Sequence, residues 1–479
     1  MMHLIPRILY VIGLLIFVSC GSSQNEFSNR PNILLIFVDD LGKEWISAYG
    51  ADSIKTPNVD QLAETGLMFE NFYVNPQCTP SRLSLFTGQY PFRHGWVNHW
   101  DVPRWGGGAH YDWRVNPGLG RIIHEAGYKT AAVGKWQVND FRVQPDAMTK
   151  HGFDDWCMWT GYETGNPASA ERYWDPYLFT KEGSRTYSGE FGEDVFTDFL
   201  INFMNENKDD PMFLYYSMCL THGPLTTTPA EPDVKGTYPQ FKAMVSYMDY
   251  SVGKLIKALE DMGLRENTIV VFMTDNGTSK GIKGTLNGRI IDGGKAATTE
   301  NGTAVPFIVN NPVMVPAGQV TDALGDITDL LPTFAELSGG QLPDDYTFDG
   351  SSMADLILGK SQDSNRDWIM SMGGGNNAAL SKKGVENQYR FRDRVLRDKE
   401  YKLYVSTERK PDQLYNLKDD PYETQNLVAS QTQKIQQAIQ KFWKVVETFP
   451  EVDSDPKYIP LGPQPWDVEV KVESQVWKK

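Results

Sequence analysis

The sequence predicts an α/β protein in which helices sandwich a large mixed, mostly parallel sheet, with a smaller α+β domain at the C-terminus. Apolar runs of strand length alternate with segments whose apolar residues recur at helical spacing. This alternation is typical of a sheet with helices on both faces. The run 32–38 is almost continuously apolar, as expected for a strand buried on both sides.

The larger predicted domain covers residues 28–360. Its first helix is expected to start at Pro57, with Thr56 as N-cap and Gly66 as the stop. Functional sites of such sheets lie beyond the carboxyl ends of the strands. Further strands are expected at 130–133, 212–218, 268–273 and 305–309, and further helices at 119–126 and 241–262.

The smaller predicted domain, with a Pro-rich tail, covers residues 361–479. Strand candidates at 391–396 and 401–405 precede a polar, turn-rich stretch and a helix at about 432–447. The sequence pattern changes at about residue 361, where long helical segments are followed by short strand candidates.

The composition excludes some classes of partner. The chain has 479 residues, enough for a sizeable core, and a formal net charge of −15. A nucleic-acid-binding protein needs a basic face to neutralise phosphates, so we expect no nucleic-acid partner. An anionic substrate stays possible, because a pocket can be locally positive on an acidic protein.

The first twenty residues resemble a targeting signal. Arg7 precedes an apolar run, 8–18, that is too short to span a bilayer permanently. Ser19 before Cys20, with polar residues after it, resembles a bacterial lipoprotein box. We therefore expect export to the periplasm or cell surface and a membrane tether through lipidated Cys20; the alternative is simple secretion with Cys20 removed or unmodified.

Three cysteines remain after this segment: Cys78, Cys157 and Cys219. An exported protein with so few thiols is not a disulfide scaffold. Cys157 and Cys219 could pair, but buried free thiols are the preferred interpretation.

Acidic residues follow two of the predicted strands. Asp39 and Asp40 end the first, and Asp275 and Asn276 end the strand 268–273. Two carboxylates ~4 Å apart repel by about 4 kcal/mol at an effective dielectric of about 20, so three in one cleft need a cation. Oxygen ligands favour Ca²⁺ or Mg²⁺ over zinc. Either pair alone would more often be a helix cap or a turn.

The segment around Cys78 is more specific. Thr79 can cap a short helix, Pro80 suits its first position, and Gly88 can end it. Cys78 then lies just ahead of a helix N-terminus, which favours an anion, and Arg82 adds a fixed positive charge. The spacing from Cys78 to Arg82 is too short for a tyrosine-phosphatase loop.

Together these motifs resemble the type I, formylglycine-dependent sulfatases of the alkaline-phosphatase superfamily. The resemblance runs from about residue 30 to 430 and implies an alkaline-phosphatase-like sheet. The matching blocks, in the family's order, are 31–40, Cys78-Thr79-Pro80-Ser81-Arg82 with 85–88, Gly134-Lys135-Trp136, Thr221-His222, Asp275-Asn276-Gly277, 294–306 and 413–427.

The resemblance also implies a mechanism. Cys78 would be oxidised to formylglycine by a separate maturation enzyme, and its hydrate would attack sulfur. Asp39, Asp40, Asp275 and Asn276, with the hydrate oxygen of residue 78, would hold Ca²⁺. Arg82, Lys135 and Lys295 would neutralise the negative charge on the hydrate and sulfate oxygens, and His222 would protonate the departing oxygen.

Two positions depart from the family pattern. Gln137 replaces the His that usually follows Gly-Lys-Trp, and an amide cannot act as a base at neutral pH. Sulfate expulsion could be slower, use another group such as His94, His99 or His110, or be lost. We expect turnover to persist, because the nucleophile, metal ligands and cations are intact. Ala304 replaces an Arg before Val-Pro, which should affect only the outer pocket.

A sulfated carbohydrate is the expected substrate, such as ulvan, carrageenan, fucan or a glycosaminoglycan. Aromatic residues that suit sugar rings cluster at 96–113 and 156–177, although half or more of them could be core. Trp100, Arg104 and Arg289 are the predicted substrate-binding residues; Arg114 and Lys283 are further cationic candidates. The alternatives are a phosphodiesterase or phosphonate monoester hydrolase of the same superfamily, and a non-catalytic glycan-binding lipoprotein.

Overall fold

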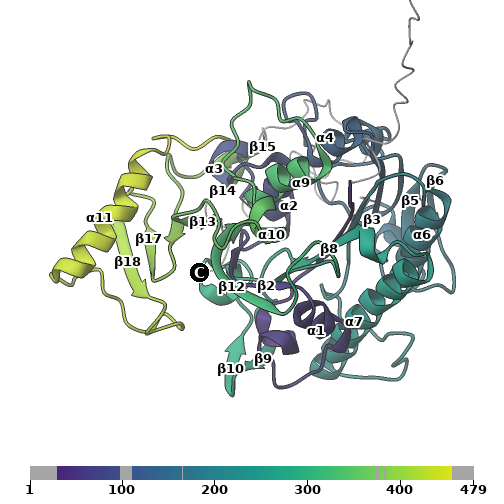
Figure 1. The fold of residues 1–479 in the computed structure, drawn as a ribbon, viewed down its shortest axis with the longest axis horizontal. Coiled ribbons are helices and arrows are strands. Elements are labelled where there is room, and N and C mark those ends of the chain that lie inside the picture. Colours follow the sequence, from purple (N-terminus) through teal and green to yellow (C-terminus); the bar gives the residue numbers. More distant parts are fainter. Residues whose placement is uncertain (1–29, 98–110, 164, 374–377, 382–383, 456–479) are drawn as a thin grey trace, which may run out of the picture.

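A ten-stranded mixed sheet forms the centre of the protein in the computed structural model, which describes residues 30–97, 111–163, 165–373, 378–381 and 384–455 (Figure 1). Its strand order is β12-β2-β11-β8-β1-β7-β3-β4-β5-β6. The strands are β1 (Asn32–Val38), β2 (Leu67–Tyr73), β3 (Lys129–Lys135), β4 (Asp155–Trp159), β5 (Tyr177–Thr180), β6 (Gly183–Thr186), β7 (Met212–Ser217), β8 (Thr268–Thr274), β11 (Phe307–Asn310) and β12 (Gln319–Asp326).

The middle of this sheet is parallel. Strand β1 pairs in parallel with both β7 and β8, and β3 pairs in parallel with β7 and β4. The carboxyl ends of these strands therefore meet at one edge. Strands β11, β5 and β6 join by antiparallel pairing, so the sheet is mixed but mostly parallel, as predicted.

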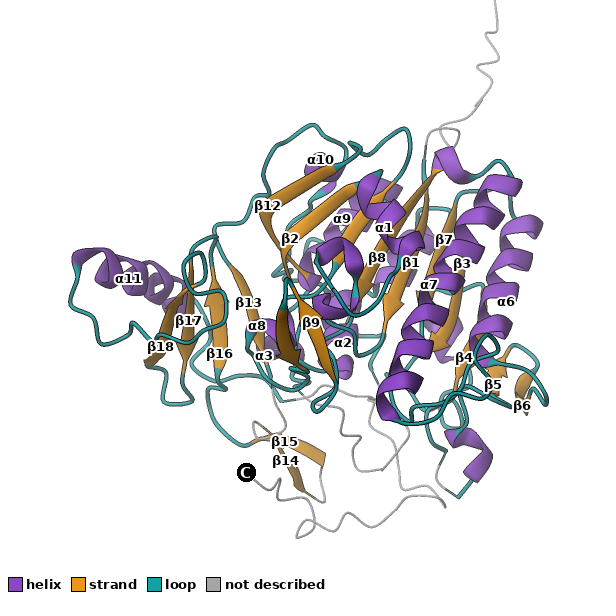
Figure 2. Cartoon of the chain, turned by 90° about the horizontal axis from the view of Figure 1, so that it is seen from below, coloured by secondary structure: helices purple, strands orange, loops and turns teal. Residues whose placement is uncertain are grey.

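Helices cover both faces (Figure 2). Successive side chains of a strand point to opposite faces, and β1 follows this rule: Leu35 packs in one apolar cluster and Leu34 in the other. Helices α2 (Cys78–Thr87), α4 (Leu119–Glu125) and α9 (Leu330–Ser338) contribute to the first cluster, and α1 (Pro57–Glu64), α6 (Gly192–Glu206) and α7 (Thr237–Asp261) to the second.

A four-stranded antiparallel sheet follows, in the order β13 (Ile369–Met372), β16 (Arg394–Arg397), β17 (Tyr401–Val405) and β18 (Pro411–Asn416). Helix α11 (Gln433–Glu447) packs on β17 and β18. Phe442 of α11 and Leu403 of β17 belong to the same apolar cluster as Leu35, so one core continues from the large sheet into the small one.

The remaining elements are short. They are β9 (Lys283–Leu286), β10 (Arg289–Asp292), β14 (Ala378–Ser381), β15 (Gly384–Asn387), α3 (Pro91–His94), α5 (Ala147–Lys150), α8 (Glu300–Thr303) and α10 (Ala354–Ile357), with 3₁₀ turns at Lys43–Trp45, Ser47–Tyr49, Pro167–Ala170, Arg265–Asn267 and Ile327–Asp329. Within the described residues, no helix is long and apolar enough to cross a membrane.

Several predicted boundaries were wrong. Helix α2 begins at Cys78 itself with Gln77 as N-cap, because the backbone turns one residue before Thr79. Helix α7 begins at Thr237 instead of 241, and β16 at Arg394 instead of 391. The predicted Thr56 cap and Gly88 stop are confirmed, and the cysteines at 78, 157 and 219 are buried and free.

Candidate active site

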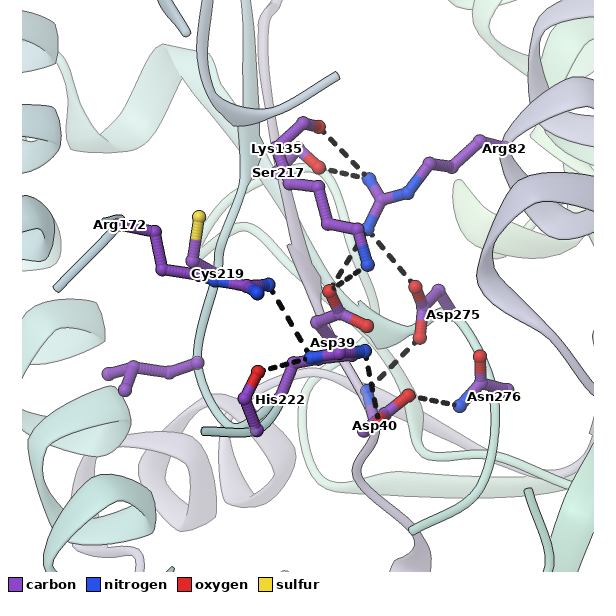
Figure 3. A network of polar contacts seen from close by, with 12 residues as sticks. Asp39, Asp40, Arg82, Lys135, Arg172, Ser217, Cys219, His222, Asp275 and Asn276 are labelled. Atoms are coloured by element: carbon purple, nitrogen blue, oxygen red, sulfur yellow. Dashed lines mark hydrogen bonds and ion pairs between the residues drawn. The ribbon is translucent and has the colours of Figure 1, made fainter. Parts of the chain in front are cut away.

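The candidate site lies where the carboxyl ends of the parallel strands meet (Figure 3). Asp39 and Asp40 follow β1, Asp275 and Asn276 follow β8, and Lys135 is the last residue of β3. Residue His222 comes from the loop after β7. Both acidic pairs predicted from the sequence therefore converge, because their strands are hydrogen-bonded neighbours of equal direction.

The two acidic pairs are joined by short contacts. Asp40 donates its backbone N–H to Asp275 Oδ1 at 3.1 Å, and Asn276 donates its side-chain amide to Asp40 Oδ1 at 2.8 Å. Asp40 has a φ of 61°, so the chain leaves the strand there and its carboxylate turns to the side of the sheet edge where Asp39 also lies. Ser279 donates to Asp40 Oδ2 at 2.7 Å.

Three cations surround these carboxylates. Lys135 Nζ lies 2.5 Å from Asp39 Oδ2, and Lys295 Nζ lies 2.6 Å from Asp40 Oδ1. Arg82 is fully buried and donates to Asp275 Oδ2 at 3.0 Å. Its other amino group is held by Tyr215, Ser217 and the carbonyl of Lys135. Arg82 is therefore fixed by a fork of bonds that a lysine could not make.

The pKa values of Asp39 and Asp275 are shifted in opposite directions. Burial would raise the pKa of Asp39, but the ammonium of Lys135 and the neighbouring cations hold it well below the usual range. Burial, together with the charge of Asp39, raises the pKa of Asp275 to about 8 against the opposing effect of Arg82. Burial and the neighbouring carboxylate therefore disfavour the ionised form of Asp275, whereas the cations favour the ionised form of Asp39.

Cys78 is next to this acidic group. Its sulfur and carboxylate oxygens of Asp39 and Asp275 all lie within 4.8 Å of one another. As the first residue of the buried helix α2, Cys78 occupies the end where backbone N–H groups favour an anion. The predicted convergence of position 78 with the acidic residues is present in the structure.

The residues at this edge suit a hard divalent cation. Within the described residues, the buried Oδ1 atoms of Asp39 and Asn276 have no hydrogen-bond partner. Asp39 follows β1 and Asn276 follows β8. Carboxylate and amide oxygens are the ligands that Ca²⁺ prefers. A cation there would also relieve the repulsion that raises the pKa of Asp275. Asp39, Asp40, Asp275 and Asn276 could therefore hold Ca²⁺.

His222 lies beside Asp40 and is partly exposed. Its Nε2 is 3.8 Å from Asp40 Oδ2, and its Nδ1 is 2.6 Å from the carbonyl oxygen of Gly223. A carbonyl oxygen can only accept, so Nδ1 carries a proton and Nε2 faces the carboxylates. Burial lowers the pKa of His222 to about 4, although Asp40 opposes the shift.

The end of β3 and the turn after it position Lys135 and Gln137. Gly134 has a φ of +90°, and a Cβ there would lie 1.9 Å from the carbonyl oxygen of Ser217. Only glycine allows β3 to approach β7 this closely. Gln137 has a φ of 64°, and its buried amide oxygen finds no hydrogen-bond partner in the part of the chain that the structure describes.

Other predicted residues have different surroundings or lie outside the described residues. Arg289 is exposed on β10, in the hairpin with β9, and its guanidinium is 3.9 Å from the ring centre of Tyr422. Both nitrogens of His94 are engaged, by Ser84 and the backbone of Trp96. Trp100, Arg104, His99 and His110 lie outside the described residues.

Sequence reasoning missed several polar residues around the site. Glu193 of α6 is buried and accepts the backbone N–H groups of Cys219 and Leu220, so it holds the loop that leads to His222. Arg172 lies against His222. No motif marks either residue; the only signal for Arg172 is its place in the aromatic cluster 156–177.

Comparisons with known proteins agree with this geometry. The sulfatase family model matches residues 31–340. The chain belongs to the sulfatase family. It is therefore a sulfuric ester hydrolase, and a second model, for the C-terminal part of N-sulphoglucosamine sulphohydrolase, matches residues 294–448.

Individual relatives cover most of this sulfatase. It is 32% identical over 366 residues to human N-acetylgalactosamine-6-sulfatase, which covers 71% of this chain and 68% of that protein. It is 27% identical to the N-acetylgalactosamine-6-O-sulfatase of Bacteroides thetaiotaomicron, over 94% and 99% of the two chains. The crystal structure of Ps i-CgsB in complex with k-i-k-neocarrahexaose matches with a TM-score of 0.74 and 25% identity, covering 93% and 96% of the two chains.

Proposed function

We propose that this sulfatase removes sulfate from a sulfated polysaccharide or oligosaccharide, with Cys78 converted to formylglycine and Ca²⁺ bound at the strand ends. One observation carries the proposal: the sulfur of Cys78 and carboxylate oxygens of Asp39 and Asp275 lie within 4.8 Å of one another. Residue 78 thus adjoins the residues that suit a hard cation.

The proposed modification would supply the nucleophile, and the proposed cation would activate it. Formylglycine, made from Cys78 by a separate maturation enzyme, provides a hydrated aldehyde as nucleophile, which a thiol cannot offer. Bound Ca²⁺ would lower the pKa of a coordinated oxygen and add positive charge.

The chain's own residues then orient and stabilise the sulfate. Arg82, Lys135 and Lys295 belong to one cluster around the carboxylates, so they can neutralise charge on the sulfate oxygens. Because Arg82 is held by several bonds, its charge is fixed before the substrate arrives.

His222 is the proposed proton donor to the departing sugar oxygen. Its Nδ1 is tied to the Gly223 carbonyl, which fixes the ring so that Nε2 faces the site. The negative charge of an incoming sulfate favours protonation of Nε2, and the proton then passes to the leaving oxygen. Gln137 cannot take a proton from the nucleophile, so we expect turnover that is limited by sulfate expulsion.

The relatives narrow the proposed substrate. The two curated relatives are named for N-acetylgalactosamine 6-sulfate, and the solved structure holds a carrageenan-type oligosaccharide. These names favour a sulfated galactan such as carrageenan, or a glycosaminoglycan, over ulvan or fucan. The proposal includes export to the periplasm or cell surface and a tether through lipidated Cys20, outside the described residues.

Sulfate release tests the proposal directly. The protein would be produced with a formylglycine-generating enzyme and incubated with sulfated oligosaccharides of both classes, and with the sulfate and phosphate esters of one alcohol. We expect sulfate release by the wild-type protein and none by Cys78→Ala. Faster cleavage of the phosphate ester would identify a phosphatase-type hydrolase instead, and binding without release would identify a glycan-binding protein.

A further inference from the structure

Arg172 is a buried cation for which the described part of the chain supplies no carboxylate partner. Arg172 is only 2% exposed. Among the residues that the structure describes, no carboxylate lies within 4.0 Å of its guanidinium nitrogens. Nη2 donates to the hydroxyl of Tyr162 at 3.1 Å, Nη1 lies 3.4 Å from His222 Nδ1, and Nε has no partner.

This arrangement differs from that of three other buried arginines, Arg82, Arg394 and Arg397. A buried guanidinium normally needs an anion, because its desolvation is otherwise uncompensated. The contrasting pairs are Arg82 with Asp275 at 3.0 Å, Arg394 with Asp453 at 2.6 Å and Arg397 with Glu300 at 2.7 Å.

Aromatic rings hold the guanidinium in place. It stacks on Trp159 at 3.8 Å from the ring centre, with Tyr162 at 5.7 Å. Such stacking offsets part of the desolvation and fixes the plane of the guanidinium, but it leaves the positive charge unneutralised. The rings hold the guanidinium in a fixed orientation in which it could bind an anion from outside the chain.

The position of Arg172 indicates which part of a substrate could supply that anion. Its guanidinium is directed toward His222 (Figure 3), on the far side of His222 from Asp40. Tyr162, which is 48% exposed, leads from this point to solvent. The sulfate under attack faces Arg82, Lys135 and Lys295, whereas a group near His222 lies on the side of the departing sugar.

We propose that Arg172 is a specificity residue that binds a second anionic substituent of the substrate, close to the sulfate ester that is cleaved. The substituent is an oxyanion, a further sulfate or a uronate carboxylate, on the same sugar or its neighbour. Both present paired oxygens that match the guanidinium fork. This inference rests on the proposed function, since it assumes that His222 faces the departing oxygen.

The test compares matched substrates. Kinetics would be measured on one saccharide with only the cleaved sulfate, one with an added sulfate and one with an added carboxylate, for wild type, Arg172→Gln and Arg172→Lys. The control is Arg185→Gln, whose side chain is 61% exposed. A hydrogen bond to a charged group typically changes affinity by a factor of roughly 10 to 100.

We expect Arg172→Gln to reduce kcat/KM about 10- to 100-fold on a substrate with the second anion and less than about threefold on the substrate without it. Arg172→Lys should show an intermediate loss, because it retains the charge but not the fork. If kcat/KM falls more on the substrate with the added sulfate, Arg172 binds a sulfate; if it falls more on the one with the added carboxylate, Arg172 binds a carboxylate. An equal loss on all substrates would overturn the inference, since Arg172 would then only position His222. The absence of any loss would overturn it as well.

A binding measurement keeps the inference testable if the variants do not fold or the proposed function fails. Titration of the unmodified wild-type protein, with Cys78 intact, should show at least about tenfold tighter binding of the saccharide with two anions. Equal affinities would overturn the inference. Absence of sulfate release by wild type from every saccharide would instead refute the proposed function, leaving the titration as a separate result.

Discussion

Substitution of Glu193 by glutamine should make the protein more stable at neutral pH. Glu193 is fully buried in α6, and its Oε1 accepts the backbone N–H groups of Cys219 at 2.9 Å and Leu220 at 3.0 Å, while Oε2 bonds Tyr216. Burial is the main cause that raises the pKa of Glu193 from 4.5 to about 7. Glutamine reproduces the protonated acid, with one oxygen that accepts and one group that donates.

The sign of the effect follows from proton binding. Because the folded protein holds the proton of Glu193 more tightly than the unfolded chain, this group contributes stability below about pH 4.5, and the contribution is lost as the pH rises to about 7. This rise of the pKa from 4.5 to about 7 corresponds to on the order of 3 kcal/mol. Glu193→Gln avoids this loss, so its advantage should grow with pH and level off above about pH 8.

Urea unfolding between pH 5 and 8 measures this difference. The free energy of unfolding of Glu193→Gln minus that of wild type should rise by on the order of 2–3 kcal/mol across this range. Glu206→Gln, an exposed change on the same helix, should give a small and flat difference. A pH-independent difference for Glu193→Gln would refute the reasoning, because the carboxyl group would then carry the same charge in both states.

Three further changes have defined outcomes. Gln137→His should raise kcat at least about tenfold by restoring a base, measured as sulfate release; an unchanged kcat would show that expulsion does not limit turnover. Gly134→Ala should lower the free energy of unfolding by about 3 kcal/mol or more, measured in urea, because its Cβ would lie 1.9 Å from the Ser217 oxygen. Added Ca²⁺ at 100 times its Kd should stabilise the chelator-treated protein by about 2.7 kcal/mol in thermal unfolding, and no shift would contradict a calcium site.

The sequence was sufficient to predict the centre of the site. Asp39 and Asp275 each follow a continuous apolar run, and parallel strands end at the same sheet edge, so their convergence needed no knowledge of distant contacts. Position 78 was recognisable because the turn and helix residues around it are local in the chain.

Other parts of the site depend on contacts that no local pattern records. Glu193 contacts the backbone of Cys219 and Leu220, and Arg172 contacts His222, only through tertiary packing of distant segments. Boundaries such as the start of α7 at Thr237 were also misjudged, because Thr237-Tyr238-Pro239 carries no clear apolar periodicity and tertiary packing decides where the helix begins. The role of Arg172 became visible only from the absence of a carboxylate among the described residues around it.

The central claim is that residue 78 acts as a formylglycine beside the acidic strand ends. The most direct measurement is the mass of the tryptic peptide that ends at Arg82, compared with sulfate release across preparations made with different amounts of maturation enzyme. Conversion removes the sulfur and two hydrogens and adds an oxygen, so the converted fraction can be quantified. The account predicts that specific activity rises in proportion to this fraction and vanishes without it; full activity in a preparation that retains the thiol would contradict it.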